Sequence, residues 1–202
     1  MEKIRTVKEI HNIDFSYKKM LSSEYAKEYV NVEQFLQYCK QCHNYGNKWA
    51  CPPFPFDVME EYWNKYKYIH LFSLKMYVNE DFFTREMDAE EINRVVKDIW
   101  HQYCLAAGNW IFEVEKNNPG SVALDGGHCS RCKKCSRMKN EPCRFGKAIR
   151  PAMDAIGANL VKTSEEIFNT KVLWITEGKI PEYFSFMVGL LSNSENIVYE
   201  EF

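Results

Sequence analysis

The longest regular pattern of apolar residues in the chain lies between Asp88 and Pro119. Apolar side chains recur there at intervals of three and four residues, which places them on one face of a helix. Asp88 with Glu91 three residues later is typical of a helix start, and Asn118-Pro119-Gly120 is typical of a stop. The pattern therefore predicts a long amphipathic helix, with its apolar face formed by Ile92, Val95, Val96, Ile99, Tyr103, Ala106, Trp110 and Val114.

Shorter patterns predict strands and small helices around this helix. Aromatic and branched residues over 68–78 predict a strand, and shorter strands are predicted over 121–124, 173–176 and 183–190. The last two should form a hairpin around the turn at residues 177–179. The first thirty residues are amphipathic and mixed, and they predict no single element.

Three short helices are also predicted, each from the residues at its ends. Asn31 should cap a helix that runs to Cys39, and a helical stretch should begin at Asp57. A third helix should have Pro151 at its first position and Gly157 beyond its end. Residues 44–47 predict a turn. The order of elements predicts an α+β fold, with helices packed on one mainly antiparallel sheet and with cysteine-rich metal-binding loops. No repeat or linker divides residues 1–202, which we expect to form a single domain.

Four cysteines lie within fifteen residues, in the spacing Cys129-x2-Cys132-x2-Cys135-x7-Cys143. This compact run is typical of loops that hold a 4Fe-4S cluster, because each thiolate reaches a different iron. We expect Cys129, Cys132, Cys135 and Cys143 to hold one such cluster. Gly126-Gly127 before the run would let the backbone approach closely. The alternative is a zinc site in which Cys129 and Cys132 pair with Cys39 and Cys42.

A second group, Cys39-x2-Cys42-x8-Cys51, supplies three further metal ligands and makes a second cluster possible. His43, Cys104 or a cysteine of the other group could complete the site. Cys104 lies on the apolar helix and is better explained as a buried thiol. With no fourth ligand, one iron would stay open to water or substrate and could act as a Lewis acid or electron donor. His128 could hydrogen-bond a cluster beside Cys129.

Charge and cysteine usage narrow the class of protein. The net charge of −2 argues against general binding of nucleic acid. Residues 129–150 nevertheless carry eight basic side chains and one acidic one. This excess favours a solvated loop, a charge that offsets an anionic cluster, or a docking face for an acidic redox partner protein. No signal peptide or membrane-spanning run is present at the sequence level, so we expect a cytoplasmic protein with reduced cysteines and no membrane partner.

The two cysteine motifs together resemble a known family. Cys39-x2-Cys42-His43-Asn44-Tyr45-Gly46-x2-Trp49-x-Cys51-Pro52-Pro53, followed by Cys129-x2-Cys132-x2-Cys135, Pro142-Cys143-Arg144-Phe145 and Pro151-x-Met153-Asp154-Ala155-x-Gly157, is similar to a prokaryotic family of predicted metal-binding proteins, domain of unknown function 2284. The resemblance spans most of the chain and implies metal binding by the seven cysteines. It implies no reaction or substrate.

Motifs of common enzyme classes are missing from the sequence, including phosphate-binding glycine loops, dinucleotide fingerprints and zinc-protease helices. The sequence therefore assigns no catalytic residue and leaves open whether the chain is an enzyme or acts on a small molecule. It predicts an iron-sulfur protein that acts in electron transfer or as a redox component of a larger enzyme system. The alternatives are a zinc-stabilised structural or interaction module and an enzyme that uses an open iron at Cys39, Cys42 and Cys51.

Overall fold

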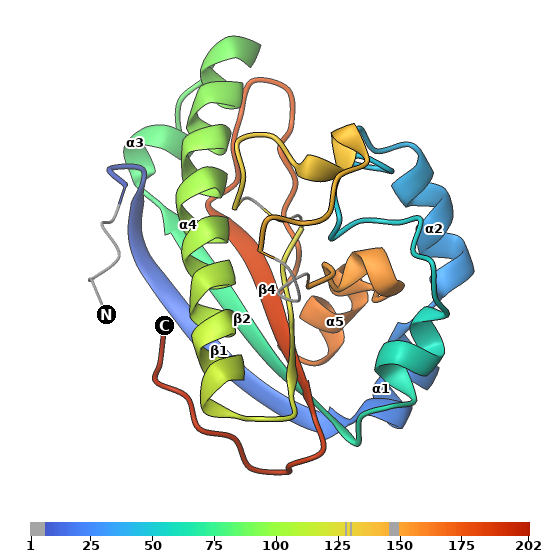
Figure 1. Ribbon diagram of the computed structural model, residues 1–202. Coiled ribbons are helices and arrows are strands. Elements are labelled where there is room, and N and C mark those ends of the chain that lie inside the picture. The colour runs from blue at the N-terminus through green and yellow to red at the C-terminus, as the bar shows by residue number, and fades with distance from the viewer. Residues whose placement is uncertain (1–6, 128, 130, 146–149) are drawn as a thin grey trace.

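The computed structural model describes residues 7–127, 129, 131–145 and 150–202, and its centre is a four-stranded antiparallel sheet (Figure 1). The strands are β1 (Ile10–Leu21), β2 (Tyr68–Val78), β3 (Val122–Leu124) and β4 (Tyr183–Ser192), in the order β1-β2-β4-β3. β2 and β4 lie in the middle and are almost continuously buried. The α+β architecture predicted from the sequence is confirmed.

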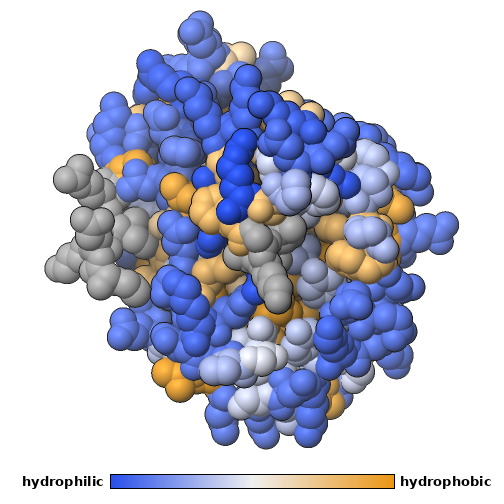
Figure 2. Space-filling model, in the orientation of Figure 1, coloured by the Kyte–Doolittle hydropathy of each residue, from blue (hydrophilic) through white to orange (hydrophobic). Residues whose placement is uncertain are grey.

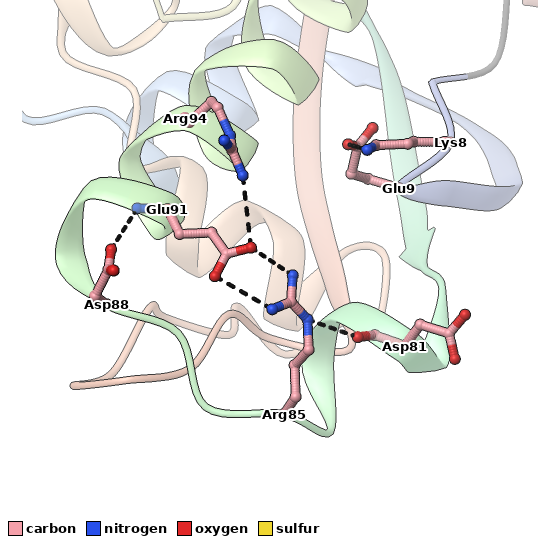
Figure 3. Close-up of polar contacts among 7 residues, drawn as sticks. All are labelled: Lys8, Glu9, Asp81, Arg85, Asp88, Glu91 and Arg94. Carbon is pink, nitrogen blue, oxygen red and sulfur yellow. Dashed lines mark hydrogen bonds and ion pairs between the residues drawn. The ribbon is translucent and has the colours of Figure 1, made fainter.

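The long helix α4 (Ala89–Asn117) covers one face of this sheet. Its start follows the prediction, because the Asp88 side chain accepts a hydrogen bond from the Glu91 backbone N–H at 2.8 Å. The Glu91 carboxylate does not return to the cap. It binds the Arg85 guanidinium instead, with N···O distances of 2.6 and 3.2 Å (Figure 3). The chain before the helix is thus fixed to its first turn.

The other face of the sheet is covered by smaller elements: α1 (Ser22–Tyr29), the π-helical turn η1 (Met59–Trp63), the 3-10 turn η4 (Asp154–Ile156) and α5 (Leu160–Glu166). Polar atoms of the large buried side chains tie these elements together. The Tyr25 hydroxyl lies 2.8 Å from Thr163 Oγ1, and Trp63 Nε1 donates to the Ile156 carbonyl at 2.9 Å. Outside this layer lie α2 (Val32–Lys40) and η2 (Ser136–Lys139). The short helix α3 (Glu80–Phe83) belongs to the opposite face, where Phe82 and Phe83 pack against the core under α4.

Several predicted elements are confirmed, and two predictions are wrong. β2, α4, β4 and the helix α2 with its Asn31 cap lie where the sequence placed them. Residues 173–176 form no strand, and only Thr176 makes an isolated bridge, to Lys179. Pro151 does not begin a helix, because the next residue, Ala152, pairs with Asp125 and the turn starts later. The sequence interpretation also missed β1 and α5.

The surface seen in Figure 2 is mainly hydrophilic, with smaller apolar areas. Exposed large apolar side chains include Met138, Phe145, Trp174 and Ile175. None of the helices in the described part of the chain has the length and apolar composition needed to span a bilayer.

Candidate metal centres

The three cysteines of the first group line one cavity of about 220 Å³. Cys39 lies in the last turn of α2, and Cys42 follows in a chain of tight turns in which its N–H donates to the Cys39 carbonyl at 3.0 Å. Cys51 is buried, and its N–H donates to the Lys48 carbonyl at 3.1 Å. The Asn44 N–H points to Cys42 Sγ at 3.5 Å. Backbone turns therefore direct three sulfur atoms toward one hollow.

Asp154 lines the same cavity, although the sequence interpretation assigned it no function. The turn η4 carries Asp154 against the start of α2, where the Asn31 N–H donates to the Gly157 carbonyl at 2.8 Å. A Cβ on Gly157 would lie 2.8 Å from the Val32 backbone, so only glycine allows this approach. Asp154 belongs to the motif that carries the family resemblance, but spacing alone could not reveal its place beside cysteines more than a hundred residues away. It is a candidate fourth ligand in place of His43.

Burial keeps the thiols of Cys39 and Cys51 protonated when no cation is present. It raises the pKa of Cys39 to about 11 and that of Cys51 to about 12, and the carboxyl of Asp154 adds to both shifts. Burial also raises the pKa of Asp154. A metal must therefore displace protons on binding, because thiolate is the form that coordinates it.

The four cysteines of the second group line a second, smaller cavity of about 30 Å³. Its wall also contains Lys48, Trp49 and Ala50, which lie just before Cys51 of the first group. The cavity is close to the size of a single water molecule. A cubane cluster is larger than this cavity. The sequence predicted that these four cysteines share one site, and the structure brings them to one hollow.

Side chains from each cysteine loop hold the other loop in place. Arg137 donates to the carbonyls of Lys48, Cys51 and Pro53, at 2.8, 2.5 and 2.6 Å. In the reverse direction, Lys48 Nζ donates to the Cys129 carbonyl at 3.1 Å, and the Trp49 indole N–H donates to the Glu141 carbonyl at 3.1 Å. The two candidate metal centres therefore lie side by side and share the segment 48–51 as a common wall.

The other residues considered as ligands have different positions. His43 is exposed and does not line the first cavity. Cys104 lines a different cavity beside α4, and burial raises the pKa of its thiol to about 12. His128 lies outside the described residues. Neither His43 nor Cys104 is grouped with the first three cysteines.

The donor set fits a soft metal or a metal-sulfur cluster, because seven of the atoms available are cysteine sulfurs. Within the described ranges, no three His, Cys, Asp or Glu side chains are already grouped as ligands of a single metal ion. The cysteines instead line the walls of two hollows. In one cavity a metal would be held by Cys39, Cys42 and Cys51. In the other cavity it would be held by Cys129, Cys132, Cys135 and Cys143.

The basic side chains around the second cavity have two different roles. The guanidinium of Arg131 stacks on the Phe112 ring, 3.6 Å from its centroid, and Arg137 binds backbone carbonyls. These arginines are therefore structural. In contrast, Lys133, Lys134 and Lys139 are exposed, and exposed Met138 and Phe145 lie in the same loop, which combines positive charge and apolar area on one surface.

Comparison with known proteins identifies the family of the chain but no individual relative. Neither the curated proteins nor the solved structures contain a significant match. The model of one family, described as predicted metal-binding protein (DUF2284), matches residues 25–191, a range that contains both cysteine groups and Asp154. The chain belongs to this family of predicted metal-binding proteins.

Proposed function

We propose that the chain is an iron-sulfur protein with two neighbouring metal centres and that it transfers single electrons, as a carrier or as the redox component of a larger enzyme system. The observation that supports this most is the division of the seven cysteines between two adjacent cavities. Cys129, Cys132, Cys135 and Cys143 would hold a 4Fe-4S cluster, since their spacing suits four irons rather than one ion. Cys39, Cys42 and Cys51 would hold a second.

The short separation of the two cavities supports transfer of electrons between them. Residues 48–50 line the second cavity and the next residue, Cys51, lines the first, so consecutive residues of one segment face the two cavities. The backbone N–H of Asn44 that points to Cys42 Sγ would stabilise added negative charge on a reduced cluster. Exchange with a partner would take place at the second centre, where the exposed lysines lie.

Purification without oxygen tests the metal assignment. The proposal predicts a brown protein that contains iron and acid-labile sulfide in similar amounts. A colourless protein with stoichiometric zinc would contradict it and would favour a structural role for the cysteine loops.

The exposed lysines provide a separate test of electron transfer at the second centre. The reduced protein is oxidised in turn by the ferricyanide anion and by the cationic complex hexaammineruthenium(III). Reversing the charge in the double variant Lys133→Glu/Lys134→Glu should slow the first reaction by roughly three- to tenfold at low salt and should not slow the second. The matched control Lys27→Glu/Lys65→Glu reverses two exposed charges elsewhere. Equal effects of both double variants would refute exchange at this surface.

A second candidate function is an enzyme that uses an open iron in the first centre. The observation in its favour is that Asp154, and not another cysteine, completes the wall around Cys39, Cys42 and Cys51. A carboxylate binds a soft metal more weakly than a thiolate does and would be exchanged more easily for a substrate oxygen. Addition of cyanide would then perturb the electron paramagnetic resonance signal of one cluster and leave the other unchanged. If neither cluster responds to cyanide, the enzyme proposal fails and electron transfer remains the proposed function.

A further inference from the structure

A large cavity with a mainly apolar lining lies beside the first metal centre. Its volume is about 500 Å³, within the range of about 300–1,000 Å³ that is typical of small-molecule sites. α4 forms one wall, α5 another, and the segment 172–175 closes the outer side. The aromatic rings of Trp100 and Phe186 meet edge to face in its wall, with centroids 5.7 Å apart.

The cavity exists because β3 is much shorter than β4. β3 pairs only with residues 189–191 of β4, and no described strand pairs with the outer edge of residues 183–188. The chain that follows β3 turns away at Gly126, where a Cβ would lie 2.3 Å from the Phe186 ring and 2.6 Å from the Met187 carbonyl oxygen. The Met187 carbonyl thus faces this edge. The backbone N–H and C=O groups of successive residues point to opposite edges of a strand. Those of Ser185, two residues before Met187, therefore face the same edge as the Met187 carbonyl.

A polar group without a partner lies in the wall of this otherwise apolar cavity. The hydroxyl oxygen of Ser185 is buried, and it has no hydrogen-bond partner among the described residues. A buried hydroxyl without a partner costs about 1–3 kcal/mol. Because this oxygen is shielded, the groups of Ser185 that a ligand can reach are the backbone N–H and carbonyl on the unpaired edge of β4. By contrast, the buried Ser164 hydroxyl in the same wall is satisfied, since it donates to the Thr170 carbonyl at 2.8 Å.

The rim of the cavity exposes apolar side chains that a soluble protein usually covers. Trp174 retains 69% of its surface and Ile175 retains 43%. At the inner end, Gly127 and Asp154 belong both to this cavity and to the cavity of Cys39, Cys42 and Cys51. A molecule bound in the apolar cavity would therefore reach the wall of the first metal centre.

We infer that this cavity binds a small, uncharged and mainly aromatic molecule, which makes a hydrogen bond to Ser185 and directs one end past Asp154 toward the three-cysteine centre. The aromatic wall selects the ring, and the nearly complete lack of charge in the lining excludes ions. Ligand binding itself is independent of the metal. Only the contact with the first centre rests on the proposed function.

The uncharged fluorophore N-phenyl-1-naphthylamine, an aromatic amine, serves as the probe for this site. Titration of the full chain as purified should give saturable fluorescence with one probe bound per chain. Glutamate at the rim, in Ile175→Glu and separately in Val161→Glu, should weaken binding at least tenfold, because the charge would have to be desolvated. The control Val198→Glu changes an exposed valine that does not line the cavity and should bind like the wild type. Circular dichroism of each variant confirms that it is folded.

Three results would overturn the inference: no saturable binding, equal weakening by Val198→Glu, or displacement of the probe by an extended peptide that pairs with the open edge of β4. Metal analysis of the same samples separates this inference from the proposed function. Probe binding by a protein without iron would refute only the proposed function, and iron without probe binding would refute only the ligand site.

Discussion

Arg137 connects the two candidate metal centres, and its removal should release the first centre although the residue lies in the loop of the second. Its guanidinium donates to the carbonyls of Lys48, Cys51 and Pro53, around the buried candidate ligand Cys51. Arg137→Met keeps most of the side-chain volume and removes all three hydrogen bonds. No cysteine is altered.

The expected loss of stability follows from the burial of these bonds. The bonds to Lys48 and Cys51 are partly buried and should contribute about 1.5 kcal/mol each, as hydrogen bonds of a charged donor do. The bond to Pro53 is exposed and should contribute only about 0.3 kcal/mol. The total is about 3 kcal/mol, which shifts a urea midpoint by about 1 M for a slope near 3 kcal/mol per molar.

Urea unfolding followed by circular dichroism measures this loss, and metal analysis after gel filtration measures metal retained per chain. Arg144→Met is the matched control, because Arg144 is also an arginine of the second loop but, among the described residues, donates to the carbonyl of Lys134 within that loop. The control should lose less than about 0.5 kcal/mol and keep its metal. If Arg137→Met has the same urea midpoint as Arg144→Met and retains the same amount of metal per chain, the two loops are not coupled as described.

Four further changes test separate parts of the account. Cys135→Ser should lose the metal of the second centre and destabilise its loop, whereas Cys104→Ala should keep all metal and lose about 1 kcal/mol of packing energy in thermal unfolding. Gly126→Ala should lower the unfolding free energy by about 2 kcal/mol or more through collision with Phe186; wild-type stability would refute that close approach. Burial raises the pKa of the Asp125 carboxyl to about 6. Between about pH 4 and pH 6 the folded protein therefore keeps a proton on Asp125 that the unfolded chain has lost. The free energy of unfolding should accordingly fall as pH rises from 4 to 6. Asp125→Asn should remove this slope and gain roughly 3 kcal/mol at pH 7; a parallel pH profile would contradict the shift.

Much of the fold could be predicted because its main elements are encoded locally. α4 and β2 have strong periodicity and clear ends, and Asn31 caps α2 through its own side chain. β1 was missed although Ile13, Phe15 and Tyr17 alternate with Asp14, Ser16 and Lys18. It lies at an edge of the sheet, and most of its apolar side chains are only partly buried. Residues 173–176 have the composition of a strand, but they line the outer side of a cavity and pair with no strand in the described chain.

The sequence identifies the candidate ligands of the two centres, but it does not predict how the two cysteine groups are arranged in space. The spacing of the cysteines within each loop is local and indicates which thiols act together. The position of segment 48–51 between the two cavities depends on hydrogen bonds made by Arg137 and Lys48. The partners of these residues lie more than eighty residues away in the sequence. Asp154 reaches the first cysteines only because Gly157 lets η4 approach α2. Such contacts have no local sequence signal.

The central claim is that the two cysteine groups form two separate metal centres, and metal analysis of single variants tests it most directly. Iron, zinc and acid-labile sulfide per chain are measured in the wild type, in Cys42→Ser and in Cys132→Ser, all purified without oxygen. The account predicts that each variant loses the iron of its own centre and retains that of the other. Loss of all metal in both variants would contradict it, since this would mean that Cys42 and Cys132 bind one shared ion.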